Sequence, residues 1–288
     1  MMESILRLFR KALNKQRSEG FVPLLSSGQH YLSNKSKRKL LRGQHQFELV
    51  TLLRYHVHKL RYSAPADPYQ PVWIDPMEID YTVSSIPITY GLGQIRDGNW
   101  DRSDNCERLD KHWICRGLRQ RFIDNCEWEN TVYYKHVEEH FKKGDRVSKW
   151  GYDTLDEFRN KRCQYVDKLF ESIQSDGYRP NFNTGHNAPD SDYRSGSAEF
   201  QHSLEPLVAI GRNGNFYSRD GRHRVCLAKI LGINTIPVQV IARHSEWQDT
   251  REIVYCADNL SGLDKEIQAY IRHPDLEEII PDSSVQLS

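Results

Sequence analysis

The feature that most constrains the fold is a stretch of fewer than forty residues, 204–242, in which short apolar segments alternate with turn-forming residues. Residues 207–210 (Leu-Val-Ala-Ile) and 216–218 (Phe-Tyr-Ser) have the composition of strands. The Gly-Arg-Asn-Gly segment that follows the first of them predicts a tight turn. The two strands are therefore expected to form a hairpin.

The second half of the same stretch predicts a helix followed by a strand. Asp220 can cap a helix over residues 221–231, and Gly232 stands where a helix commonly ends. Residues 236–241 (Ile-Pro-Val-Gln-Val-Ile) are rich in β-branched side chains and predict a further strand. Strand, hairpin, helix and strand in so short a span indicate an α+β fold with a small mixed sheet.

Outside this stretch the pattern is mainly helical. Residues 72–74 predict a first strand, and loop is expected from there through Gly98. Helices are expected from about Asp110 and over residues 132–141. Thr154 begins a capping box, Thr-x-x-Glu, which opens a further long helix.

A basic pentapeptide, residues 220–224 (Asp-Gly-Arg-His-Arg), lies where the second hairpin strand passes into the helix. A helix N-terminus attracts anions, and Gly221 would let a phosphate approach the backbone. Arg222, His223 and Arg224 place potential cations in the first turn, where positive charge opposes the helix dipole. This arrangement predicts an anionic ligand, most simply a nucleotide phosphate. The alternative is that the arginines fold back onto acidic surface residues.

These residues, with the Val-Cys-Leu-Ala-Lys-Ile-Leu-Gly-Ile-Asn-Thr-Ile-Pro-Val that follows, resemble the phosphate-binding box of the ParB/sulfiredoxin superfamily. Residues 73–76 resemble the first strand and turn of that family, 169–178 its "SIxxxG" helix, and 204–210 the next strand. The resemblance covers residues 72–243 and is interrupted by about 60 inserted residues, 101–161. It implies a ParB/sulfiredoxin-type sheet with a helical insertion.

The resemblance also implies a nucleotide pocket for ATP or CTP with Mg²⁺. The family includes chromosome-partition CTPases, ATP-dependent sulfinic acid reductases, free-serine kinases and relatives described as nucleases. Gly221 and Arg224 match the positions that cradle phosphate, and Asp220 and His223 match the DGxHR form of the serine-kinase branch. Arg222 stands where the reductase has its catalytic cysteine, which argues against reductase chemistry.

The kinase branch uses a carboxylate base after the first strand, and three residues are candidates for it: Glu78, Asp97 and Asp101. Asp220 of the box is a further catalytic candidate. Partition proteins need a downstream helix-turn-helix and a dimerisation tail, and since about 45 residues, acidic overall, follow Ala242, we do not expect that role. We therefore expect phosphoryl transfer or nucleoside triphosphate hydrolysis.

Two neighbouring segments are expected to contribute to the same pocket. Arg243 and His244, with Trp247 close behind, follow the last strand and could hold a base and a phosphate, although a packing cluster is an equally good interpretation. Residues 96–101 (Arg-Asp-Gly-Asn-Trp-Asp) have the composition of a binding loop and also of an ordinary tight turn.

Charge is unevenly distributed along the chain. Residues 1–62 contain 13 Lys and Arg against 3 Asp and Glu, whereas the remainder contains 27 against 36. We expect a basic helical arm over 1–64, a proline-rich linker within 63–71, a core over 72–245 and an acidic helix and tail over 246–288. The arm could dock onto the core, or it could bind nucleic acid or an anionic membrane surface. A nucleic-acid binder or nuclease, using the basic arm and the same arginines of residues 220–224, is therefore the alternative function, and a nucleotide-gated interaction module is a third.

One motif suggests a metal. Residues 136–140 (His-Val-Glu-Glu-His) match the inverted zinc motif, and Glu199 could supply a third ligand. The surrounding residues are typical of an ordinary exposed helix, so no catalytic zinc is expected, and the sequence assigns no metal-ligating residue.

The sequence also carries signs of cellular location. It contains no apolar run long enough for a membrane-spanning helix and no uninterrupted hydrophobic segment within residues 1–20. Its six cysteines never form Cys-x-x-Cys and are irregularly spaced. We therefore expect reduced thiols in a cytoplasmic protein.

Overall fold

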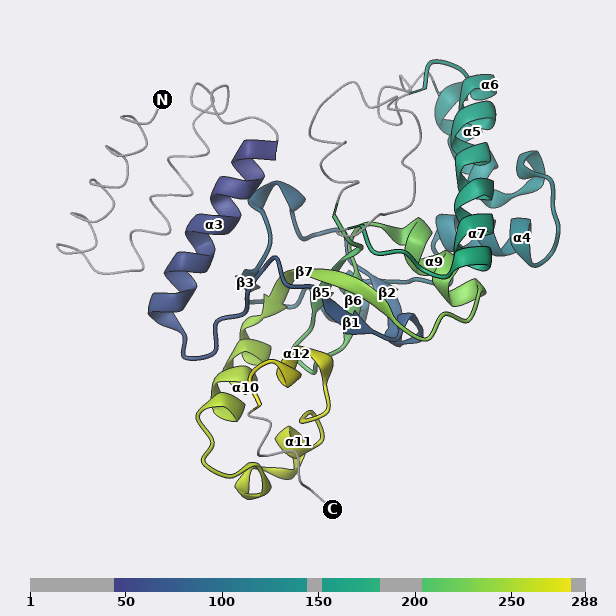
Figure 1. Ribbon diagram of the computed structural model, residues 1–288. Helices are drawn as coiled ribbons and strands as arrows, with labels where there is room; N and C mark the ends of the chain where they lie inside the picture. The colour runs from purple at the N-terminus through teal and green to yellow at the C-terminus, as the bar shows by residue number, and fades with distance from the viewer. Residues whose placement is uncertain (1–43, 144–151, 182–203, 281–288) are drawn as a thin grey trace, which may run out of the picture. The chain divides into compact units, whose positions relative to one another are not determined.

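The computed structural model describes residues 44–143, 152–181 and 204–280, and within them the chain has a mixed α+β fold (Figure 1). The contacts divide the chain into two compact units, Met1–Gln46 and Phe47–Ser288. The sheet and every site described below lie in the second unit.

The sheet has seven strands in the order β1-β7-β5-β6-β2-β4, with β3 paired to β7 outside this path. Strands β2 and β6 run parallel, as do β3 and β7 and also β5 and β7; the other pairs are antiparallel. The strands are β1 (Val72–Ile74), β2 (Ile79–Thr82), β3 (Gln94–Arg96), β4 (Glu107–Arg108), β5 (Leu207–Ile210), β6 (Phe216–Ser218) and β7 (Ile236–His244).

The structure confirms the hairpin, helix and strand predicted for residues 204–242. This stretch forms the antiparallel pair β5 and β6, then α9 (Arg222–Ile230), then β7, which continues to His244. All residues of β5 and β7 are buried, because β7 lies between neighbouring strands and its two faces are covered by separate hydrophobic clusters. The ParB/sulfiredoxin resemblance itself stays a proposal.

The prediction of loop through Gly98 is wrong, because β2 and β3 lie within that span. Both strands are very short. Strand β3 pairs with β7 and β2 with β6, each more than a hundred residues away along the chain, and β2 pairs also with the two-residue strand β4. Residues of β2 follow a buried, exposed, half-buried, buried pattern rather than a clean alternation. These strands are therefore held in the sheet by pairing with distant strands, and not by a regular alternation of buried and exposed residues.

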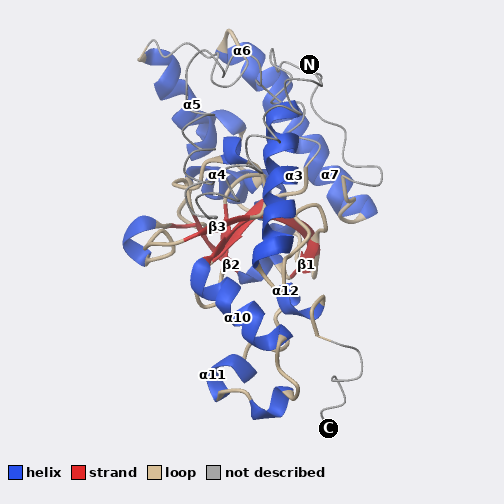
Figure 2. Cartoon of the chain, turned by 90° about the vertical axis from the view of Figure 1, so that its left-hand side faces the viewer, coloured by secondary structure: helices blue, strands red, loops and turns tan. Residues whose placement is uncertain are grey.

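The helices of the predicted insertion are present. They are α4 (Trp113–Phe122), α5 (Val132–Lys142) and α6 (Leu155–Glu157). A π-helical turn (Phe158–Cys163) leads from α6 into α7 (Gln164–Asp176), which lies beyond the insertion and belongs to the predicted core. Figure 1 shows α4, α5 and α7 on one side of the molecule and the C-terminal helices α10 to α12 below the sheet, and Figure 2 shows the same separation from α10 and α11. Helices α4 and α5 touch closely at Gly117, where a Cβ atom would lie 2.2 Å from Cβ of Tyr133.

The C-terminal segment is fixed by a buried acidic residue. It forms α10 (Ser245–Tyr255), α11 (Lys265–Gln268) and α12 (Pro274–Glu277). The Asp275 carboxylate is fully buried and pairs with Arg243 of β7 and with Arg251 of α10, and it accepts a 2.9 Å hydrogen bond from Nε1 of Trp247. This network joins α12 to β7 and α10.

The proline-rich segment that was predicted as a linker is anchored. The backbone amides of Ser63 and Ala64 donate to the Glu252 carboxylate of α10, and Gln248 donates to the Ala64 carbonyl. The part of the predicted arm that belongs to the second unit is also held, through α3 (Gln44–Arg61). Residues 1–43 of the arm lie outside the described residues.

In that helix, the side chains of Thr51 and Arg54 both bind Leu92. Thr51 Oγ1 accepts a hydrogen bond from the Leu92 amide, and Arg54 donates to the Leu92 carbonyl at 2.8 Å. Phe47 is buried in the hydrophobic cluster on this side of the sheet. The segment from Phe47 onward is thus part of the folded unit.

The expectation of reduced thiols is wrong for one pair, because Cys115 of α4 and Cys226 of α9 form a disulfide. Their separation of 111 residues along the chain hid the pairing from the spacing pattern. The other four cysteines (Cys106, Cys126, Cys163, Cys256) are free. Within the described ranges, no helix is both long and apolar enough to cross a bilayer.

Candidate functional site

The topology places the predicted site residues in two separate groups. The box of residues 220–224 follows β6 and lies beside the start of β5, where the Leu207 amide donates to the Asp220 carbonyl. Asp97 and Asp101 lie instead beside the carboxyl ends of β3, β5 and β7, which point the same way. The four residues of β5 separate these two edges by roughly 13 Å at about 3.3 Å per residue.

Gly221 is required by packing as well as by the helix start. It has a φ of +72°, in the left-handed region that favours glycine. A Cβ atom here would lie 2.8 Å from Cα of Pro206. Pro206 therefore occupies the space through which a phosphate was expected to approach Gly221. The residue is the N-cap of α9 and offers no side-chain hydrogen bond to the first turn, whereas the Asp220 carboxylate accepts from the Gly221 amide instead.

Arg224 points back to the segment before β5. Its Nη2 donates a 2.7 Å hydrogen bond to the Leu204 carbonyl, and its Nη1 lies 3.6 Å from the buried Glu205 carboxylate. Glu205 also accepts from the Asn181 backbone amide. These contacts hold residues 204–206 against α9, which is the role of a structural cation.

His223 is held by the insertion. Its Nε2 lies 3.0 Å from the Tyr133 hydroxyl, and its Nδ1 lies 3.3 Å from Nη2 of Arg162. Its ring also meets the Tyr133 ring edge-on, with centroids 5.5 Å apart. His223 therefore joins α9 to α5 and to the π-helical turn.

Arg222 differs from its neighbours, because its one hydrogen bond in the described part of the chain goes to a neutral group. Its Nε donates to Oγ1 of Thr82 at 2.8 Å, and Thr82 in turn donates to the Ser218 carbonyl. Burial lowers the pKa of Arg222, with attraction to Asp220 opposing that shift. Among the described residues it forms no ion pair, and its hydrogen bond there is made by Nε, not by the terminal nitrogens.

Arg219 repeats this pattern next to Arg222. Its Nε donates to the Ile86 carbonyl at 2.5 Å, it too lacks an ion pair within the described ranges, and burial lowers its pKa. The charge of Arg219 also lowers the pKa of Arg222, whereas attraction to Asp220 opposes the effect of burial on both arginines. Two partly buried cations with neutral partners are unusual, because buried charges are normally paired.

Two further side chains are linked to this group: Ser218 pairs with Thr82 between β6 and β2, and the charge of Arg222 acts on His112. The Ser218 hydroxyl is fully buried and has no hydrogen-bond partner in the described part of the chain. His112 is the N-cap of α4 and accepts the Ile114 amide at Nδ1, so its ring proton is on Nε2. Burial, then the charges of Arg222 and His136, lower the pKa of His112 to about 4. We call Thr82, His112, Ser218, Arg219 and Arg222 the α9 cluster.

Only Arg222 of this cluster was a predicted site residue. Arg219 could have been found as a fourth basic residue beside the box. Thr82 and His112 carry no local signal, since they come from β2 and from the inserted helices.

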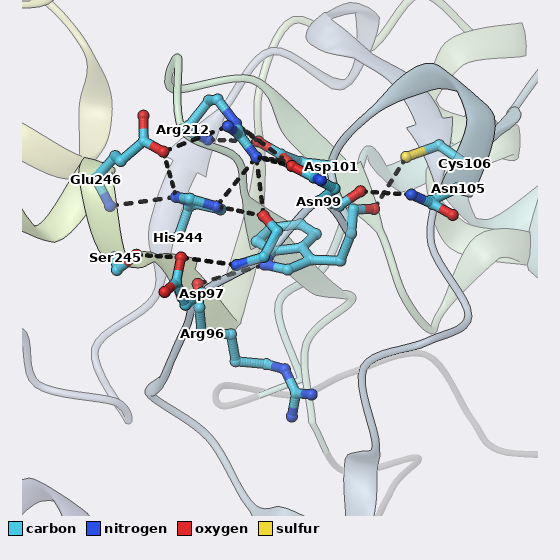
Figure 3. Close-up of polar contacts among 12 residues, drawn as sticks. Arg96, Asp97, Asn99, Asp101, Asn105, Cys106, Arg212, His244, Ser245 and Glu246 are labelled. Carbon is cyan, nitrogen blue, oxygen red and sulfur yellow. Dashed lines mark hydrogen bonds and ion pairs between the residues drawn. The ribbon is translucent and has the colours of Figure 1, made fainter.

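The second group of predicted residues forms a closed network (Figure 3). The Asp101 carboxylate is buried and accepts from the Arg212 backbone amide at 2.9 Å and from the Arg212 guanidinium at 2.9 Å. Burial raises the pKa of Asp101, but the hydrogen bonds from Arg212 outweigh it and the net pKa is lowered. A cavity of about 230 Å³ adjoins this pair. Its lining consists of Asp101, Arg102, Ser103, Arg212, Asn213, Asn215 and Tyr217.

The remaining members of this network serve local structure. Asp97 is exposed and accepts from the Gly98 amide at 2.7 Å and from Ser245 at 3.3 Å, which together lower its pKa. His244 is buried, caps α10 through Nδ1, and has Nε2 2.8 Å from the Gly98 carbonyl (Figure 3). These contacts keep the loop after β3 attached to the start of α10.

Two predicted residues lie apart from the α9 cluster. Arg243 is buried and its guanidinium is paired with Asp275, so it belongs to the C-terminal network. Glu78 is exposed, before β2, and burial followed by the charge of Asp75 raises its pKa. Lys229, at the far end of α9, binds the Ile79 carbonyl beside Glu78, whereas Arg222 binds Thr82. Glu78 therefore lies near the opposite end of the helix from Gly221.

Comparisons with known proteins identify no family. No family model matches the chain, and neither the curated proteins nor the solved structures include a match. The chemistry of the α9 cluster therefore rests on its own residues.

The zinc motif of residues 136–140 forms no ligand set in the described part of the chain, where no group of three or more His, Cys, Asp or Glu is placed to hold a metal. The His136 ring stacks on Trp113 with centroids 4.2 Å apart. The third ligand considered, Glu199, lies outside the described residues.

Proposed function

We propose that this protein binds the phosphates of a nucleotide, ATP or CTP, between the first turn of α9 and the end of β2, in a fold of the ParB/sulfiredoxin type. One observation carries the proposal: Arg219 and Arg222 are partly buried, donate hydrogen bonds to neutral groups and form no ion pair among the described residues, with Asp220 the one carboxylate that attracts both. A bound phosphate would supply further counter-charge through charge-assisted hydrogen bonds.

The surroundings of the two arginines suit the same ligand. The N-terminus of α9 carries the positive end of the helix dipole, and its cap Gly221 contributes no side-chain acceptor. Nε2–H of His112 adds a neutral donor. Several donors around a desolvated cation pair favour a ligand with more than one negative charge, such as a di- or triphosphate.

Asp220 is the carboxylate of the box. It would bind Mg²⁺ together with the phosphate oxygens of the ligand. Mg²⁺ is usually bound by one or two carboxylates plus phosphate oxygens. One Asp220 oxygen accepts from the Gly221 amide, which fixes the carboxylate beside the proposed phosphate position. Mg²⁺ bound there would neutralise charge on the phosphates.

The proposed activity is phosphoryl transfer or triphosphate hydrolysis, with Asp220 as the carboxylate that orients or deprotonates the attacking hydroxyl or water. Of the predicted catalytic carboxylates, Asp220 alone adjoins the α9 cluster, since Asp97 and Asp101 lie at the other sheet edge. Asp220→Asn should therefore retain binding of the nucleotide without metal, measured in EDTA, and lose turnover with Mg²⁺ by about 100-fold or more.

Nucleic-acid binding or nuclease activity is the competing proposal, through the basic arm of residues 1–64, of which 1–43 lie outside the described residues, and the same arginines of the box. A thermal-shift panel separates the two. ATP, ADP, CTP, GTP and pyrophosphate, each with Mg²⁺ or with EDTA, are compared with single-stranded and duplex DNA. We expect triphosphates to raise the melting temperature and DNA to leave it unchanged. A response to DNA alone would favour the competing proposal.

A further inference from the structure

The disulfide joins the inserted helices to the helix that carries the proposed phosphate site. The Cα atoms of Cys115 and Cys226 lie 5.4 Å apart, within the range of about 4.4–6.8 Å that disulfides occupy. Cys115 is half-buried and Cys226 is buried. The more accessible sulfur is thus on α4.

On each of the two helices, the disulfide-bonded cysteine lies about one helical turn from a residue of the α9 cluster. Residues four apart on a helix share a face, so Cys226 lies on the same face of α9 as Arg222. On α4, Cys115 is in the first turn and His112 is the N-cap. The disulfide therefore fixes the spacing between His112 and Arg222.

We propose that Cys115 and Cys226 form a reversible redox link that regulates ligand affinity at the α9 cluster. This inference rests on the proposed phosphate site. In the oxidised protein α4 is held against α9, and the donors of the cluster are pre-organised. In the reduced protein the ligand must also order the contact between the two helices, so binding is weaker.

The chemistry is thiol–disulfide exchange with a small-molecule disulfide such as glutathione disulfide. The Cys115 thiolate attacks one sulfur of that disulfide and releases one thiol, which leaves a mixed disulfide. The Cys226 thiolate then attacks the Cys115 sulfur and releases the second thiol. Two protein thiols are oxidised, one disulfide is reduced to two thiols, and the two cysteine protons end on the released thiols.

The test measures binding of pyrophosphate and ATP to the full chain by calorimetry after equilibration with oxidised or with reduced glutathione. Peptide mapping after alkylation reports the Cys115–Cys226 link in each sample. We expect affinity at least 5-fold tighter in the oxidised sample, the lower end of typical coupling between two events. Cys115→Ser, which leaves the buried Cys226 in place, should bind like reduced wild type in both buffers.

Cys256→Ser is the matched control, because Cys256 is exposed and free, and it should respond to glutathione as wild type does. A link that forms without changing affinity, or a link that never forms, would overturn the inference. If neither state binds pyrophosphate or ATP, the proposed phosphate site is wrong. The redox link is then judged by amide exchange in the first turn of α9, where equal protection in both states would refute it.

Discussion

Arg222 of α9 donates its Nε hydrogen to Oγ1 of Thr82, 2.8 Å away, across 140 residues of sequence. This bond directs the guanidinium toward the end of β2 and away from the segment that Arg224 holds. Two arginines two residues apart thus have different partners, one a neutral hydroxyl and the other a carboxylate. The difference leads to opposite expectations for their substitution.

Arg224→Ala should destabilise the free protein. The change removes the hydrogen bond to the Leu204 carbonyl and leaves the buried Glu205 carboxylate without its nearest guanidinium. Breaking a buried ion pair by removing one partner commonly costs about 3 kcal/mol. Urea unfolding measures this loss. The double variant Arg224→Gln/Glu205→Gln should recover part of it, and a wild-type unfolding free energy for Arg224→Ala would show that these contacts are not structural.

The Asp275 network should make stability depend on acid pH. Arg243 and Arg251 hold the pKa of Asp275 far below that of an unfolded aspartate, overcoming the effect of burial. The unfolded chain therefore binds a proton that the folded chain does not, and the stabilisation is lost as the pH falls below about 4.

Urea unfolding from about pH 6 to about pH 3 tests this expectation. Wild type should lose stability steeply at the acid end, whereas Asp275→Asn should be less stable throughout, by about 3 kcal/mol or more at neutral pH, with a shallower acid slope. The exposed Asp249→Asn should follow wild type. Equal acid slopes for wild type and Asp275→Asn would contradict the assignment.

His112 should remain neutral well into the acid range. Burial, with the nearby positive charge of Arg222, lowers its pKa to about 4, below the ordinary value of 6.5. Because the folded pKa is depressed, the unfolded chain takes up the proton first, so this residue's contribution to stability declines as the pH falls from about 6.5 toward 4.

An NMR titration of the ring protons of His112 reports that pKa directly. In Arg222→Gln the pKa should rise only in part, since burial is the larger cause and remains. An unchanged value in Arg222→Gln would place the two side chains too far apart for the proposed cluster.

Two N-terminal deletions should differ in their effect on stability, depending on whether helix α3 is kept or removed. Removal of residues 1–43 leaves α3 whole, and the sheet-bearing unit should keep its melting temperature, because that unit begins at Phe47. Removal of residues 1–64 also deletes Phe47, Thr51 and Arg54, exposes apolar surface and frees the Leu92 backbone groups. We expect that longer deletion to aggregate or to melt at a clearly lower temperature. Equal melting of both would show that α3 is dispensable.

The local signals of the sequence predicted the local structure well. The hairpin of β5 and β6, helix α9 and strand β7 follow one another directly, so turn residues and β-branched runs were sufficient. Strands β2 and β3 could not be predicted in this way, because their residues become strands only through pairing with β6 and β7.

The partners of the box residues could not be predicted either. The sequence identified Arg222, His223 and Arg224 as a cationic turn, but their partners come from β2, from α5 and the π-helical turn, and from the segment before β5. The positions of the candidate carboxylates could not be predicted for the same reason. The direction of the strands places Asp97 and Asp101 at the other edge of the sheet from the box. A spacing pattern gives residue types, whereas tertiary topology decides which of them meet.

The most direct test of the proposed phosphate site is calorimetric titration of ATP and of pyrophosphate, with Mg²⁺, into wild type and Arg222→Gln. Glutamine keeps a polar group near Thr82 but removes the charge. We predict binding weaker by about 10- to 150-fold, which corresponds to about 1.5–3 kcal/mol, with an unchanged or slightly raised melting temperature of the free protein. Arg116→Gln, an exposed arginine of α4, should match wild type. Unchanged affinity in Arg222→Gln, or a large fall in the melting temperature of the free variant, would contradict the account.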